Sequence, residues 1–107
     1  MTRGELYRVY KPGADKREYR TFVIVSRQAL SESNFSSVVC APVFSSGQGL
    51  STQVPVGPPE GLAQEGWIAC DSLQSIAKRE LTHYVGSLAE SKIAELNEAL
   101  ELALGLG

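Results

Sequence analysis

Polar and apolar residues alternate at the start of the chain and then give way to two continuous apolar runs. Residues 5–10 show the alternation, which predicts a first, half-buried strand. Residues 21–26 and 38–43 are rich in β-branched side chains and have the length of fully buried strands, so we expect them at the centre of a sheet. Residues 11–19 contain a Pro-Gly pair and many charged residues, which predicts an exposed loop between the first two strands.

The middle of the chain predicts shorter elements. Residues 52–56 can form a strand that Pro55 confines to the edge of a sheet or to a bulge. Residues 66–70 and 84–88 are further strand candidates, and we expect a short helical turn over residues 75–80 between them.

One amphipathic helix is predicted to end the chain. Ser87 and Glu90 have the spacing of a capping box, and Gly105 is a natural stop. Between them apolar residues recur at helical intervals, at Ile93, Leu96, Leu100, Ala103 and Leu104. Five or six strands and one long helix predict an α+β domain with a small barrel. Because no repeat or linker divides the sequence, we expect residues 1–107 to form a single domain.

The composition is that of an ordinary soluble globular protein. Hydrophobic residues make up 43% of the 107 residues and charged residues 21%. The longest apolar stretches are far shorter than the roughly 20 residues needed to cross a bilayer, and no charged-then-apolar leader opens the chain. We therefore expect a cytoplasmic protein with no membrane contact. Cys40 and Cys70 lack metal-ligand spacing, so two buried free thiols are expected.

Charge is distributed unevenly along the chain. Residues 1–20 carry six basic and three acidic side chains, whereas residues 21–107 carry four basic and nine acidic ones. An anionic ligand would therefore prefer the first segment, although a cluster this small is also compatible with an ordinary solvated loop.

The sequence lacks the residues of the commonest enzyme motifs. Its single histidine, His83, excludes two-histidine ribonuclease chemistry and is expected to be an ordinary polar residue. A phosphate-binding glycine loop, a nucleophile elbow and a Cys/His cluster are all missing, so no metal or cofactor is expected. Any catalysis must use arginine, carboxylates and hydroxyls.

Five segments, taken in order, resemble the MazF/PemK toxins over nearly the whole chain. Residues 3–7 (Arg-Gly-Glu-Leu-Tyr) resemble the opening strand of that family, and Gly13 precedes Arg20 at the spacing of the family's Gly-Ser-Glu-Gln-x-x-x-Arg-Pro loop. Residues 39–45 resemble the family's Val-Ala-Pro-Ile-Thr-Ser strand end, and residues 67–73 resemble its strand that ends in Asp-Gln-Ile. Residues 85–100 resemble its Gly-x-Leu and the terminal helix that follows.

The resemblance implies a fold and an activity. The fold is a small SH3-like antiparallel β-barrel with a C-terminal helix. The activity is that of a sequence-selective, ribosome-independent and metal-independent endoribonuclease. In this family the 2′-hydroxyl of single-stranded RNA attacks the adjacent phosphate, leaving a 2′,3′-cyclic phosphate and a 5′-hydroxyl. The implied partners are single-stranded RNA, a cognate antitoxin and a second copy in a homodimer.

The resemblance also implies site residues. Arg20 matches the loop-ending arginine, whose guanidinium suits the charge that gathers on phosphate oxygens. Asp15 falls where the family has Glu and could take the 2′-hydroxyl proton. Phe44 stands where a catalytic Thr is expected, so the adjacent Ser45 could supply the hydroxyl while Phe44 stacks on a base. The remaining substrate contacts implied by the resemblance are Lys16, Arg17, Ser46 and Asp71.

Two other functions remain open for a chain of this fold. Some toxins of this shape poison DNA gyrase through a C-terminal Trp-Gly-Ile, whereas this chain ends Leu-Gly-Leu-Gly and has its only tryptophan at Trp67. A catalytically weakened member that keeps only antitoxin binding is the other alternative, prompted by Phe44 and Asp15.

Overall fold

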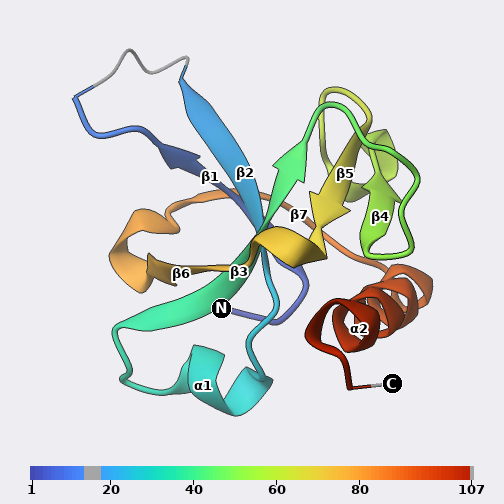
Figure 1. Ribbon diagram of the computed structural model, residues 1–107. Helices are drawn as coiled ribbons and strands as arrows, with labels where there is room; N and C mark the ends of the chain where they lie inside the picture. The colour runs from blue at the N-terminus through green and yellow to red at the C-terminus, as the bar shows by residue number, and fades with distance from the viewer. Residues whose placement is uncertain (14–17, 107) are drawn as a thin grey trace.

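The computed structural model describes residues 1–13 and 18–106 of the chain. This part of the chain contains a seven-stranded sheet and two α-helices (Figure 1). The elements run in the order β1 (Glu5–Tyr10), β2 (Tyr19–Ile24), α1 (Gln28–Glu32), β3 (Ser37–Phe44), β4 (Gln53–Val56), β5 (Gly66–Ala69), β6 (Gln74–Ala77), β7 (His83–Ser87) and α2 (Glu90–Leu104). Short 3-10 helices lie between the later elements, at η1 (Pro58–Glu60), η2 (Cys70–Ser72) and η3 (Lys78–Glu80).

The sheet is organised around its longest strand, β3. The strands form the path β4-β5-β3-β2-β1-β7, and β6 joins as a further partner of β3. Along β3, the first residues pair with β6, the middle residues with β2 and the last residues with β5, all antiparallel. Because β6 and β5 pair with successive parts of one twisted strand, the sheet curls around β3 (Figure 1). The curled sheet and the terminal helix confirm the predicted small antiparallel barrel.

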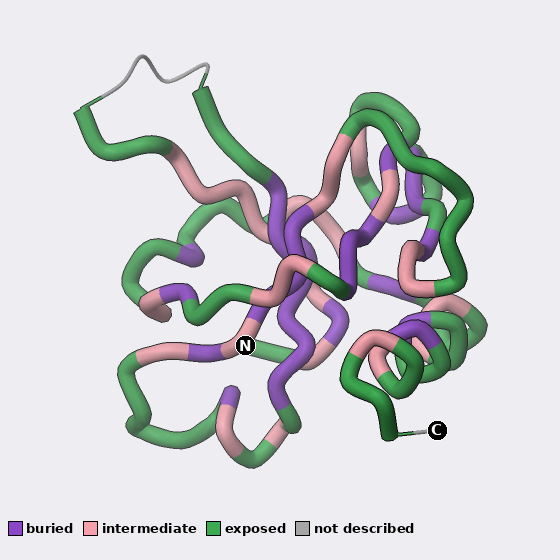
Figure 2. The backbone as a smooth tube through the Cα atoms, viewed as in Figure 1, coloured by how far each residue is buried: buried purple, intermediate pink, exposed green. Residues whose placement is uncertain are grey.

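Apolar clusters cover both faces of the central strands. Val23 belongs to the cluster between the sheet and α2, while Phe22 and Ile24 belong to a second cluster on the other face. Successive side chains of a strand point to opposite faces, so one continuous apolar run can supply both clusters. Residues 21–26 are accordingly all buried, as the purple segment through the middle of Figure 2 shows. The expectation of full burial is confirmed for residues 21–26, whereas in residues 38–43 Val39 and Val43 are only partly buried.

The terminal helix α2 packs on the sheet through four residues of the predicted stripe, Ile93, Leu96, Leu100 and Ala103, whereas the fifth, Leu104, is exposed. Leu96 is fully buried in the main cluster, and the helix lies against β4 and η2. Gly105 ends it in the left-handed conformation, with φ of 70°. The next residue, Leu106, donates its backbone N–H to the Glu101 carbonyl over 2.8 Å, which closes the last turn. The predicted stop at Gly105 is confirmed.

The predicted capping box at the start of this helix is wrong. Ser87 belongs to β7, where it pairs with Glu5 of β1, and its hydroxyl lies 2.7 Å from the Tyr84 hydroxyl. The helix begins at Glu90 after Ala89, which makes no side-chain capping bond. Pairing with β1 holds Ser87 in the sheet, so its side chain is not available to the helix.

The first half of the interval that was expected to be a helical turn is a strand. Ser75 pairs with Val39 and Ile76 with Val38, which places these residues in β6 at the start of β3. Only residues 78–80 form a helical turn, η3. Pairing with the buried strand β3 outweighs the weak local preference of this polar segment.

The edge position of Pro55 is confirmed. Pro55 lies in β4, which ends the path of strands and pairs only with β5 in the described sheet. Its carbonyl accepts a hydrogen bond of 2.6 Å from the Lys92 ammonium of α2. A residue without an N–H fits this position because one side of an edge strand needs no ladder partner.

Both cysteines are buried free thiols, as expected. Burial raises the pKa of the Cys40 thiol from 9.0 to about 12. The pKa of the Cys70 thiol rises to about 11, through burial and then the nearby Asp71 carboxylate. Neutral thiols of this kind are poor nucleophiles, which agrees with a purely structural role.

Candidate active site

Arg20 lies on the face of the sheet that carries the smaller apolar cluster. It precedes Phe22 by two residues in β2, so both side chains point to the same face. Phe22 pairs with Pro42 of β3, and continuing this antiparallel register brings Phe44 opposite Arg20. The guanidinium carbon stands 4.6 Å from the centre of the Phe44 ring, a cation–π arrangement. One guanidinium nitrogen also donates to the Val43 carbonyl over 3.4 Å. The exposed guanidinium is thus held at the end of β3.

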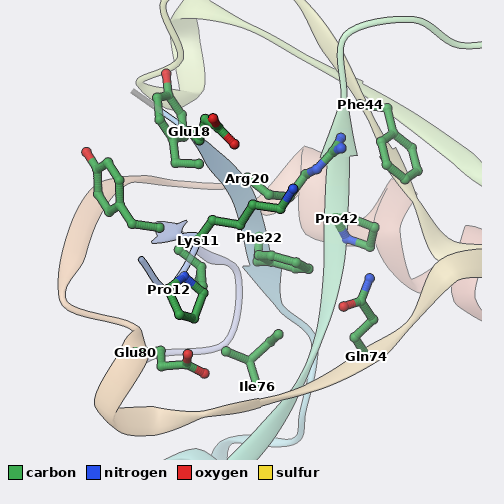
Figure 3. Close-up of a pocket in the computed structure, with 13 residues that line it drawn as sticks. Lys11, Pro12, Glu18, Arg20, Phe22, Pro42, Phe44, Gln74, Ile76 and Glu80 are labelled. Atoms are coloured by element: carbon green, nitrogen blue, oxygen red, sulfur yellow. The ribbon is translucent and has the colours of Figure 1, made fainter. Parts of the chain in front are cut away.

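A cleft of about 620 Å³ opens beside this pair (Figure 3). Its floor is apolar and is built from Phe22, Pro42 and Ile76 on three adjacent strands. Its rim is polar and bears both signs of charge, from Lys11, Glu18, Arg20 and Glu80, together with the neutral amide of Gln74 and the phenols of Tyr10 and Tyr19. An apolar floor with a polar rim suits a ligand that has flat apolar faces and polar edges.

Phe44 lines both this cleft and a second, smaller hollow. The second hollow, of about 310 Å³, is lined by Phe44, Ser45 and Thr21 among others. Ser45 is exposed at the bend that follows β3 and lines only this second hollow. Ser45 and Arg20 therefore line different hollows.

Two of the other predicted contacts lie away from both hollows. Ser46 is exposed in the loop after β3 and lines neither of them. Asp71 lies in η2, where its carboxylate accepts a hydrogen bond of 2.6 Å from the Thr52 hydroxyl. That bond ties the start of β4 to the end of β5, so the structure gives Asp71 a local structural contact.

The predicted residues Asp15, Lys16 and Arg17 lie outside the described residues. The residues on either side of that segment lie at the cleft. The Lys11 N–H donates to the Glu18 carbonyl over 3.1 Å, and both residues line the rim.

Several rim residues were not predicted from the sequence. Tyr10 and Tyr19 are cross-strand partners with ring centres 5.5 Å apart, and the guanidinium carbon of Arg8 lies 4.6 Å from the centre of the Tyr19 ring. Two tyrosines flanking the charged loop were a usable signal, but their pairing depends on a register that the sequence does not reveal. Gln74 was missed because its strand was expected to be largely a helical turn.

His83 is exposed in β7, as expected for an ordinary polar residue. Its ring centre lies 4.7 Å from that of Tyr10, and one ring nitrogen lies 3.0 Å from the Thr82 hydroxyl. In the described part of the chain, no group of three or more His, Cys, Asp and Glu side chains could hold a metal ion. Neither helix described above is both long and apolar enough to span a bilayer.

A curled antiparallel sheet with a terminal helix, and an arginine-bearing cleft on the opposite face, define a small toxin of the MazF fold. The structure matches the Mycobacterium tuberculosis toxin MazF-mt6 with a TM-score of 0.82 and 27% identity, over 96% of this chain and 98% of that one. It also matches a mycobacterial endoribonuclease in complex with its cognate antitoxin, with a TM-score of 0.85 and 28% identity, over 100% and 97% of the two chains.

The sequence gives the same assignment. Residues 2–104 match the family described as PemK-like, MazF-like toxins of type II toxin–antitoxin systems. The endoribonuclease MazF3 of Mycobacterium tuberculosis (strain CDC 1551 / Oshkosh) is 32% identical over 87 residues, which cover 81% of this chain and 84% of the relative. The chain belongs to the PemK/MazF family of toxins.

Proposed function

We propose that the chain is an endoribonuclease toxin that cuts single-stranded RNA without a metal ion or a ribosome. The observation that supports this most strongly is the family match over residues 2–104, with relatives named endoribonucleases. These relatives favour RNA cleavage over gyrase poisoning. We propose that residues 1–107 act as one catalytic domain in the cytoplasm.

The proposed reaction is an internal transesterification. The 2′-oxygen bonds to the adjacent phosphorus while the bond from phosphorus to the 5′-oxygen breaks. The 2′-hydroxyl gives up a proton and the leaving 5′-oxygen gains one, so the products are a 2′,3′-cyclic phosphate and a 5′-hydroxyl. Asp15 is the proposed proton acceptor, and the Arg20 guanidinium stabilises the charge that builds on the phosphate oxygens.

Substrate binding is assigned to the same region. Lys16 and Arg17 belong to the segment that begins and ends at the cleft rim, and they supply positive charge for the RNA backbone. Phe44 supplies an aromatic ring for a base. Because Ser46 and Asp71 line neither hollow, the proposal gives them no direct contact with the reacting phosphate.

Incubation of the purified protein with total RNA tests the activity. We expect fragments with 2′,3′-cyclic phosphate ends and 5′-hydroxyl ends, formed equally well with a chelator present. Binding of the antitoxin without any cleavage would instead support the weakened toxin. Cleavage that stops on chelation would contradict the metal-independent reaction.

The catalytic hydroxyl has its own test, because Phe44 occupies the position where the family has Thr. Ser45→Ala should reduce cleavage strongly if the Ser45 hydroxyl contacts the phosphate. A silent Ser45→Ala together with a more active Phe44→Thr would show that the hydroxyl belongs at position 44 and that this chain is a weakened nuclease.

We also propose that a cognate antitoxin occupies the RNA-binding surface. One solved structure that this chain resembles is an endoribonuclease in complex with its cognate antitoxin. The apolar floor and the cations Lys11 and Arg20 suit an extended segment that carries both apolar and acidic side chains. The product of the gene upstream should be retained by the wild type and lost by Arg20→Glu. Equal capture by both would place the antitoxin elsewhere.

A further inference from the structure

The Gln74 side chain lines the cleft but has no role in the proposed reaction. Gln74 is the first residue of β6 and pairs with Cys40 of β3, so it lies beside the apolar floor of the Arg20 cleft. Its side chain is exposed and points from β6 toward Pro42 (Figure 3). Its side-chain amide lines the cleft and is open to a ligand.

The Gln74 amide differs in kind from the charged groups of the rim. Lys11 and Arg20 can only donate hydrogen bonds, the carboxyl oxygens of Glu18 and Glu80 accept them, and the phenols of Tyr10 and Tyr19 each carry a single hydroxyl. The Gln74 amide offers an N–H donor and a carbonyl acceptor side by side. This pair matches a base edge on which a donor and an acceptor are adjacent.

We propose that Gln74 reads the edge of one nucleobase of the RNA substrate and so determines the cleavage sequence. This inference rests on the proposed function, because it takes single-stranded RNA as the ligand of the cleft. Phe22, Pro42 and Ile76 offer an apolar surface to the base that Gln74 reads. Arg20 then binds the adjacent phosphate, and Phe44 stacks on a neighbouring base. Single-stranded RNA is recognised in this way, with bases stacked on protein and their edges hydrogen bonded.

The chemistry of the amide predicts how a substitution changes the base preference. A base that cannot pair with Gln74 leaves its polar atoms unsatisfied in the cleft, and such mismatches are discriminated strongly. A glutamate of the same size offers two acceptors and no donor. Guanine is the base whose Watson–Crick edge carries two adjacent donors, at N1 and N2. Gln74→Glu should therefore move the preference at one position toward guanine.

The experiment uses binding as well as cleavage. Mapping the 5′-hydroxyl ends of wild-type digests gives the preferred sequence. Short synthetic RNAs of that sequence, with a 2′-deoxy nucleotide at the attacking position, then bind without being cut, and each flanking base is varied in turn. For the wild type we expect one position at which the wrong base weakens binding about 10-fold or more. In Gln74→Ala that ratio should fall below about 3-fold.

Ser75→Ala is the matched control. Ser75 is the next residue of β6, exposed and absent from the cleft lining, so the base preference should stay that of the wild type. If Gln74→Ala binds no RNA, the isosteric Gln74→Glu decides the question. An unchanged order of bases in these Gln74 variants overturns the inference while wild-type cleavage still supports the proposed nuclease. A wild type that neither binds nor cuts RNA overturns the nuclease itself.

Discussion

At the scale of single residues, Arg20 is the most informative position for catalysis. Its guanidinium is exposed and held against Phe44, so Arg20→Ala should leave the fold intact. We expect cleavage to fall by about 10²-fold or more, because an oriented donor that stabilises transition-state charge is lost. Arg20→Lys should recover little, since lysine keeps the charge but lacks the planar fork. Single-turnover cleavage of one defined RNA measures both variants.

Thermal unfolding of the Arg20 variants provides the control for that experiment. Unchanged unfolding temperatures would assign the loss of activity to the site. Cleavage at the wild-type rate by Arg20→Ala would show that the catalytic group lies elsewhere. Wild-type activity in Arg20→Lys would indicate a simple charge contact in place of an oriented one.

The two buried thiols predict how stability depends on alkaline pH. Their pKa values in the folded protein are about 12 and about 11, above the ordinary value of 9.0. Between pH 9 and these values the unfolded chain loses protons that the folded chain keeps, so stability falls as the pH rises. Each thiol contributes a slope of up to about 1.4 kcal/mol per pH unit in this window. Urea unfolding across the window should show the decline.

A variant with Cys40→Ala and Cys70→Ala should show a shallower decline than the wild type. Tyr7 remains in that variant, and its pKa is raised to about 12 by burial and by the Glu5 carboxylate, so part of the slope should persist above pH 10. An identical slope in both proteins would mean that the thiols do not control the alkaline limit.

At the scale of elements, the helix α2 stabilises the curled sheet through one buried side chain above all. Leu96 is fully buried in the main cluster. Leu96→Ala should lower the free energy of unfolding by about 2–5 kcal/mol, because the removed atoms leave a cavity. Glu98→Ala on the exposed side of the helix should change it by less than about 0.5 kcal/mol. Denaturant unfolding compares them, and equal losses would contradict this account of the core.

The elements also show what could be predicted from the sequence. The runs that form β2 and β3 are buried on both faces, so their composition alone identifies them as central strands. The segment of β6 is polar at Gln74 and Ser75, and only its pairing with β3 makes it a strand. Ser87 shows the same limit, since a local capping signal was outweighed by pairing with a distant strand.

The candidate site likewise contains a residue that the local sequence indicates and residues that only the sheet pairing brings together. Arg20 could be named as a candidate because its resemblance to the family's loop-ending arginine depends on a spacing from Gly13 that is local in sequence. Its partner Phe44 is brought near it by the pairing of β2 with β3, and the neighbouring Gln74 by the pairing of β6 with β3. A shift of one residue would turn each of these side chains to the other face, so sequence alone could not place them together.

At the scale of the whole molecule, the two faces of the sheet have different tasks. The helix α2 covers one face, while the Arg20 cleft opens on the face of the second cluster. Substitutions that weaken the packing of α2 can therefore lower stability without altering the cleft. Substitutions such as Arg20→Ala can abolish cleavage without lowering stability.

The homodimer that the family resemblance implies needs a contact surface, and we propose one at the C-terminal end of α2. The end of α2 and the residues after it expose Leu102, Leu104 and Leu106, each more than half accessible. We propose that these leucines form the contact surface, because a symmetric dimer would bury the same apolar side chains from both copies. Sedimentation at micromolar concentration should give a dimer for the wild type and a monomer for a variant with Leu102→Glu and Leu106→Glu. Glu98→Lys on the same helix changes charge at an exposed site and should remain dimeric. A wild-type protein that sediments only as a monomer would contradict the dimer, and a dimeric leucine variant would place the interface on another surface.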